Sequence, residues 1–303
     1  MSGFSSINWL IPKTLNEAVA AMEEHRGEAL LYAGGTYVHE QRERGALLKI
    51  KAIVDLEGLG LDTIENGGDS IKAGAMVTLN KVIGSDAFRA AGFEALVQAA
   101  YATGPDQIKN AATLGGAVAC WVPVIDIVPV LMSLRAKAVV QVARESRTIE
   151  VGDLLNGPEK TLLGKTALIS GFLLPRPAPG SRSQFKKFRR SASDWAVVNA
   201  SASIRSDGAG RCVDAKLVVG ARADGYFSLP RTEQFLIGKQ IDGKALAAVP
   251  GIVSTELTLT DHFTASADYK RSLCGFLLRD AIAGAAKIDV SQARDAKGVD
   301  RHG

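Results

Sequence analysis

Two pairs of adjacent glycines place the strongest constraint on how this chain can fold. The first pair lies in AGGT, Ala33–Thr36, directly after the short apolar run Ala29–Tyr32, which is typical of a strand. The second lies in TLGG, Thr113–Gly116. Adjacent glycines let backbone N–H groups converge on one point and form a nest for anions. Either loop alone can be a plain tight turn, but two of them in one half of the chain favour a diphosphate ligand.

Neither glycine loop has the spacing of the common nucleotide motifs. GxGxxG and GxxxxGK[ST] are both absent from these positions, so the sequence supports neither a Rossmann dinucleotide fold nor a P-loop NTPase. Pro123-x-x-Asp126 follows the second loop. Asp126 can accept a hydrogen bond from a ligand hydroxyl, or it can be an acid favoured at a helix N-terminus.

Local signals predict a mixture of helices and strands. Thr14, with Glu17 three residues later, predicts a capped helix to Glu24. Gly67-Gly68-Asp69 predicts a hairpin, and Ala46–Leu56 reads as rich in β-structure. The second half reads as an antiparallel meander from Gln184 to Gly220, followed by helices of which the longest is Tyr269–Ala286.

Length and composition set the broad class. A chain of 303 residues suggests two domains of roughly 150 residues each, and PRPAPGSRS at Pro175–Ser183 is the best interior boundary. With 47% hydrophobic and 22% charged residues the chain is an ordinary globular protein. The net charge is +4, and its densest basic run, Lys186–Arg190, is too short to indicate a nucleic-acid-binding face.

The cysteines and histidines offer no metal or catalytic set. Cys120, Cys212 and Cys274 are far apart, so the chain shows no iron–sulfur or zinc ligand pattern of its own. Scarce cysteines suit a reducing compartment, and the N-terminus does not resemble a signal peptide, so we expect a cytoplasmic protein without a membrane span. The four histidines are isolated, and neither HExxH nor GxSxG occurs.

The ordered set of motifs resembles one family. AGGT, QIKNAATLGG at Gln107–Gly116, Pro123-x-x-Asp126 and KKFRRSASDWAVVNA at Lys186–Ala200 occur in the order and at the distances found in the FAD-binding medium subunit of the molybdenum hydroxylases. That family includes xanthine dehydrogenases, carbon monoxide dehydrogenase flavoproteins and 4-hydroxybenzoyl-CoA reductase. The resemblance covers nearly the whole chain, from Asn8 to Ala286.

The resemblance implies an α+β fold. Residues 1–176 would form a PCMH-type FAD-binding domain of two α/β subdomains. Residues 182–290 would form the smaller C-terminal domain, with a three-stranded antiparallel sheet and helices, and residues 291–303 a polar tail. FAD would lie between the domains.

The resemblance also implies the cofactor contacts. Backbone N–H groups of both glycine loops would hold the FAD pyrophosphate, Leu168 would touch the flavin ring, and Lys186 would reach toward it. The full set of FAD-binding residues carried over by position is Ala33, Gly34, Gly35, Thr36, Tyr37, Thr103, Thr113, Gly115, Gly116, Ala117, Asp126, Leu168 and Lys186. No residue of this chain is assigned a catalytic or metal-binding role.

The implied activity is that of an oxidoreductase subunit. FAD would pass electrons between two [2Fe–2S] clusters of a small subunit and an external acceptor or donor. A large molybdopterin subunit would carry out the substrate chemistry. The resemblance suggests an (αβγ)₂ assembly, with no nucleic acid and no membrane among the partners.

Three positions depart from the family pattern. Tyr37 stands where Asp, Asn or Ser is usual, Ala117 replaces the Asn of TIGGN, and Trp121 lies in an apolar stretch before Pro123. They leave open an alternative, a structural subunit whose flavin is lost or idle and which supports non-redox chemistry at the partner's molybdenum site. A free-standing flavoprotein oxidase is a further alternative, but the sequence offers no clear histidine for covalent flavin attachment.

Overall fold

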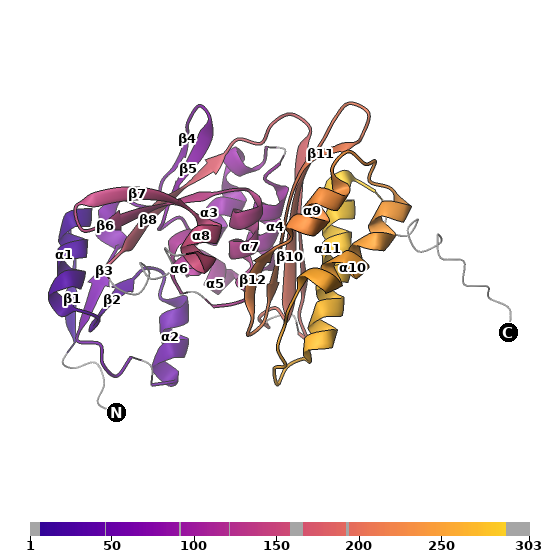
Figure 1. The fold of residues 1–303 in the computed structure, drawn as a ribbon. Helices are drawn as coiled ribbons and strands as arrows, with labels where there is room; N and C mark the ends of the chain where they lie inside the picture. Colours follow the sequence, from indigo (N-terminus) through magenta and orange to yellow (C-terminus); the bar gives the residue numbers. More distant parts are fainter. Residues whose placement is uncertain are drawn as a thin grey trace. The chain divides into compact units, whose positions relative to one another are not determined.

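Three sheets organise the part of this chain that the structure describes (Figure 1). It is a computed structural model, and it describes residues 7–45, 47–90, 92–120, 122–157, 166–191 and 194–288. The residues divide into two compact units. Unit 1 consists of Met1–Ala87, Thr103–Trp121 and Arg135–Arg176, and unit 2 of Phe88–Ala102, Val122–Leu134 and Pro177–Gly303.

Unit 1 begins with a small parallel sheet in the order β1-β3-β2. The strands are β1 (Asn8–Leu10), β3 (Ala52–Asp55) and β2 (Ala29–Tyr32). Helix α1 (Leu15–His25) buries Ala18, Val19 and Met22 in the apolar cluster that contains the inner residues of β2 and β3. The Thr14 hydroxyl accepts from the Glu17 N–H at 3.2 Å, so the predicted cap is confirmed. In the range Ala46–Leu56, expected to be rich in β-structure, the described residues 47–56 hold one strand, β3, and the turn η1 (Glu57–Leu59) follows it.

The second sheet of unit 1 has five antiparallel strands in the order β4-β5-β8-β6-β7. They are β4 (Ile64–Asn66), β5 (Ser70–Gly74), β8 (Leu168–Pro175), β6 (Lys137–Val142) and β7 (Glu145–Glu150). The predicted hairpin between β4 and β5 is confirmed, and Arg176 donates to the Gly67 and Gly68 carbonyls at its turn. Besides α1, the helices described in this unit are α2 (Thr36–Glu43), α3 (Leu79–Gly84), α5 (Asp106–Ala111), α6 (Leu114–Ala119) and α8 (Val151–Asn156).

Unit 2 is built on a four-stranded antiparallel sheet in the order β12-β11-β10-β9. Three long strands match the expectation, namely β9 (Ser181–Phe188), β10 (Val198–Ser206) and β11 (Cys212–Ala221). The short strand β12 (Gly225–Ser228) adds a fourth that the sequence pattern missed. Figure 1 shows α9 (Pro230–Leu236), α10 (Gly243–Glu256) and α11 (Ala267–Ala286) against one face of this sheet. Alternate residues of β10 and β11 pack with these helices in one apolar core.

The other face of that sheet meets two helices from the first half of the chain. They are α4 (Glu94–Ala102) and α7 (Ile127–Ser133), and the turn η2 (Asp86–Phe88) precedes α4. Glu94 accepts the Ser183 N–H at 3.1 Å, and Gln98, one turn on, accepts the Phe185 N–H at 2.8 Å. These side chains satisfy two outward N–H groups of β9, which is an edge strand of the described sheet.

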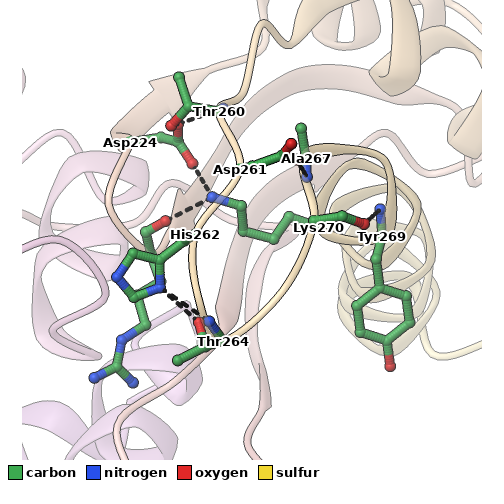
Figure 2. Close-up of polar contacts among 10 residues, drawn as sticks. Asp224, Thr260, Asp261, His262, Thr264, Ala267, Tyr269 and Lys270 are labelled. Atoms are coloured by element: carbon green, nitrogen blue, oxygen red, sulfur yellow. Dashed lines mark hydrogen bonds and ion pairs between the residues drawn. The ribbon is translucent and has the colours of Figure 1, made fainter.

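Lys270 and Asp224 form a buried ion pair in unit 2 (Figure 2). The Lys270 side chain is 0% exposed and that of Asp224 is 4% exposed. The ammonium also donates to the Arg222 carbonyl at 2.7 Å, and the Thr260 hydroxyl donates to Asp224 at 2.7 Å. The pair ties the first turns of α11 to the turn between β11 and β12.

Neither compact unit is one continuous stretch of the sequence. The last change of unit, after Arg176, falls next to the expected boundary, but α4 and α7 belong to unit 2 although they precede it. Which sheet these two helices cover depends on contacts with strands far along the chain, so local signals could not assign it. The polar tail 291–303 lies outside the described residues. None of the described helices is long and apolar enough to cross a membrane.

Candidate flavin-binding site

The first glycine loop joins β2 to α2 in unit 1. Gly35 is the N-cap of α2 and has φ +66°, where glycine avoids the strain that a side chain brings. Gly34 packs so closely on the end of α5 that a Cβ there would lie 1.6 Å from the Ala111 carbonyl oxygen. The loop therefore needs both glycines, one for its conformation and one for its close approach to the chain just ahead of the second loop.

The first loop leaves backbone donors without a partner. Among the residues that the structure describes, no acceptor takes the N–H groups of Gly34, Gly35 or Thr36. These groups lie at the N-terminal end of α2, where the helix dipole also favours negative charge. A diphosphate fits this donor set, because it brings several acceptor oxygens and a negative charge.

Replacing Gly35 with alanine tests how tightly the loop is built. We expect Gly35→Ala to lower the free energy of unfolding by more than the ~1–2 kcal/mol of the left-handed backbone alone, because its Cβ would meet the Tyr32 hydroxyl, 2.4 Å away. Gly60→Ala is the matched control, since Gly60 has the same φ of +66° and nothing within 4 Å of its Cβ position. Urea denaturation measures both, and equal losses would contradict the close contact.

The second glycine loop uses its donors internally. Thr113 caps α6, its hydroxyl accepting from the Gly116 N–H at 3.0 Å and its carbonyl from the Ala117 N–H at 2.9 Å. The Leu114 N–H donates to Val77 and the Gly115 N–H to Ala75. All four N–H groups from Leu114 to Ala117 thus have protein acceptors, and the loop can serve a ligand through its position and its Thr113 hydroxyl rather than through an open nest.

Leu168 and Thr103 also lie in unit 1 but differ in exposure. Leu168, in β8, is 0% exposed and packs in the cluster beneath α1, so only its backbone is available to a ring. Thr103 directly follows α4 and is half-buried. Trp121, the bulky departure from the family pattern, lies outside the described residues.

Asp126 lies in unit 2, where two side chains of the sheet hold its carboxylate. Lys187 Nζ contacts Oδ2 at 2.6 Å, and Asn199 Nδ2 donates to Oδ1 at 3.2 Å. Lys187 and Asn199 are direct partners on β9 and β10, so they share one face of the sheet. The Asp126 side chain is 4% exposed and that of Lys187 8%. Asp126 thus forms a buried ion pair with Lys187 and is also the N-cap residue of α7.

Lys186 and Lys187 differ in the face they occupy. Neighbouring strand residues point to opposite faces, and Lys186 pairs with Ala200, a residue of the core under α10 and α11. Sequence reasoning singled out Lys186 and missed Lys187 and Asn199. Lys187 does belong to the basic run noted in the sequence. Because side chains alternate between the two faces of a strand, the alternation along β9 is the signal that places Lys187 and Lys186 on different faces.

The cysteines of unit 2 are inert. Burial raises the pKa of the Cys212 thiol to about 11 and that of Cys274 to about 12, so both remain protonated at neutral pH. In the described ranges, no group of three His, Cys, Asp or Glu side chains is arranged to hold a metal ion.

Comparison with known proteins identifies the class. Residues 5–177 match the FAD binding domain in molybdopterin dehydrogenase, and residues 183–285 match the CO dehydrogenase flavoprotein C-terminal domain. Together the matches define an FAD-binding oxidoreductase subunit. The chain belongs to the family of FAD-binding medium subunits of the molybdenum hydroxylases.

Individual relatives are similar to this chain over nearly their whole length. The chain is 26% identical to the nicotine 6-hydroxylase medium subunit of Paenarthrobacter nicotinovorans, over 91% of this chain and 96% of that protein. It is 25% identical to the carbon monoxide dehydrogenase medium chain of Hydrogenophaga pseudoflava, over 89% and 94%. A crystal structure of the Cu,Mo-CO dehydrogenase matches with a TM-score of 0.86 and 25% identity, over 95% of this chain and 99% of that one.

Proposed function

We propose that this chain is the electron-transfer subunit of a heteromeric molybdenum hydroxylase. FAD would pass electrons between [2Fe–2S] clusters of a small subunit and an external acceptor or donor, while a large molybdopterin subunit acts on the substrate. Bound FAD supplies the ability to exchange electrons singly or in pairs. The open N–H groups at the N-terminus of α2 carry the proposal, because they offer the donor set that a flavin diphosphate needs.

The cofactor contacts form part of the same proposal. Within the first loop, Ala33–Tyr37, the N–H groups of Gly34, Gly35 and Thr36 would bind the pyrophosphate. Thr113 and the glycines after it would shape the neighbouring wall. Asp126 would meet a flavin hydroxyl only in exchange for part of its present pairing. Lys186 would reach the flavin ring from the sheet face opposite Lys187 and Asp126, and the backbone at Leu168 would lie near that ring.

Domain boundaries, assembly and location complete the proposal. The family matches support domains at 1–176 and 182–290. The names of the relatives, which are medium subunits or chains, support assembly with a large and a small subunit, and an (αβγ)₂ complex is proposed. Three free cysteines suit a cytoplasmic location.

One observation favours a second candidate. Because the N–H groups from Leu114 to Ala117 are all donated within the chain, the second loop adds little to a phosphate site. A subunit that kept the fold while its flavin became idle would look the same there. In that case it would serve as a scaffold for non-redox chemistry at the partner's molybdenum site.

The test is cofactor analysis of the native complex, purified through a tag on this chain. We expect one FAD per copy of the chain, identified by chromatography after heat release, together with co-purified molybdopterin and [2Fe–2S] subunits. Gly35→Ala should lower the FAD content, and Gly60→Ala should not. An intact, active complex without flavin would overturn the redox function and leave the scaffold.

A further inference from the structure

Val124 has a backbone conformation that its residue type disfavours. Its φ is +78°, a region where a β-branched residue is a genuine outlier. Such strain persists only where the surroundings impose it. The side chain is 2% exposed. Val124 is the middle residue of Val122–Asp126, which we call the flavin-side turn because it leads from the second glycine loop to Asp126.

Two side chains of the four-stranded sheet impose this conformation. Asn199, in β10, donates from Nδ2 to the Val124 carbonyl at 3.2 Å and to Asp126. The Tyr226 hydroxyl, in β12, accepts the Ile125 N–H at 2.7 Å and donates to the Val122 carbonyl at 2.8 Å. The turn is therefore held at its beginning, its middle and its end.

A second unfavourable feature lies beside the first. Asn199 is 0% exposed, and its Oδ1 has no hydrogen-bond partner among the described residues. An unsatisfied buried acceptor destabilises the fold, because it gives up its hydrogen bonds to water and gains none in return. Gly220, opposite Asn199 on β11, makes room for the amide, since a Cβ there would lie 2.3 Å from Oδ1. Local rules broken together at one place are typical of functional rather than purely structural sites.

We propose that Asn199 and Tyr226 are positioning residues for FAD, an inference that rests on the proposed function. They hold the flavin-side turn in its strained form. The last residue of the turn is Asp126, which the proposed function assigns to the flavin. These two side chains, which we call the clamp, thus fix the stretch of chain that leads to Asp126, and neither of them has to touch the cofactor. Preorganisation of this kind strengthens ligand binding by removing the free-energy cost of ordering the turn.

The test compares two hydroxyl deletions in the full chain. Tyr226→Phe removes the clamp and keeps the ring. Ser201→Ala is the matched control, because Ser201 lies two residues beyond Asn199 on the same strand face. Its hydroxyl bonds Ser133 of α7 at 2.7 Å, both residues being 0% exposed. Flavin fluorescence during titration of the flavin-free chain with FAD gives the Kd, and thermal melting of the flavin-free chain gives the structural effect.

We expect Tyr226→Phe to raise the Kd for FAD about tenfold, the result of two lost hydrogen bonds at the turn. Ser201→Ala should leave the Kd near the wild-type value while lowering the melting temperature by a similar amount. Asn199→Ala should act like Tyr226→Phe. If wild-type protein binds FAD and both clamp variants match Ser201→Ala, the inference is wrong and the proposed function stands. If wild-type protein binds no FAD, both are overturned.

Discussion

Replacing Lys270 with methionine is expected to lower the free energy of unfolding by about 3–5 kcal/mol, because it leaves a buried carboxylate without its cation. Asp224 is 4% exposed, and among the described residues the Thr260 hydroxyl and N–H also donate to it (Figure 2). Methionine is close to lysine in length and keeps the apolar packing of the stem, so the loss reports the charge. Urea denaturation of the full chain measures it.

Asp268→Asn is the control for an ordinary ion pair of the same helix. Asp268 contacts Arg271 one turn on, but its side chain is 91% exposed. Exposed pairs contribute about 0–1 kcal/mol. The double variant Asp224→Asn, Lys270→Met should recover part of the loss, because it leaves no unpaired buried charge. Equal losses in Lys270→Met and Asp268→Asn would contradict the buried-pair account.

Acid should act on the same pair in a defined direction. Burial by itself would raise the pKa of Asp224, but hydrogen bonds from Lys270 and Thr260 outweigh it and hold the pKa below its usual value of 3.8. A carboxyl whose pKa is lower in the folded state stabilises the fold above its unfolded pKa, and that stabilisation is lost as the pH falls further. The difference between wild type and Lys270→Met should therefore narrow below about pH 4.

The helices and strands that could be predicted from the sequence are those determined by residues close together in the chain. The α1 cap at Thr14 and the β4–β5 hairpin at Gly67–Gly68 depend on residues a few positions apart. Strand β12, with only four residues, and α2, which buries no residue, lack such a signal. The long strands of unit 2 were visible because they alternate or run apolar, whereas the two helices on their second face could not be assigned from sequence.

The candidate site also has one part that could be predicted from neighbouring residues and one part that could not. The glycine loops could be read from the sequence because glycine at a tight approach has few substitutes, and Gly34 against Ala111 is such an approach. The clamp on the flavin-side turn could not, since Tyr226 bonds Val122 across 104 residues of chain. Nor does composition distinguish Lys186 from Lys187. That difference depends on the register of β9, in which a shift of one residue exchanges the two faces.

Lys187→Met is expected to lower the free energy of unfolding by about 3–5 kcal/mol, whereas Lys186→Met should change it by less than about 0.5 kcal/mol. Lys187 compensates the Asp126 carboxylate at 2.6 Å, and both side chains are more than nine-tenths buried. The Asn199 amide also donates to that carboxylate, at 3.2 Å, but it carries no charge that could compensate it. Lys186 is half-buried on the opposite face of the strand.

The two lysine variants also separate stability from cofactor chemistry. If Lys186 reaches the flavin ring, Lys186→Met shifts the flavin reduction potential of the FAD-loaded chain while its unfolding curve stays at the wild-type midpoint. Removing a nearby positive charge makes reduction harder, so the potential should fall. Lys187→Met should instead move the unfolding midpoint first. An unchanged potential in Lys186→Met would remove that residue from the flavin site. Equal stability of the two variants would contradict the buried pair with Asp126.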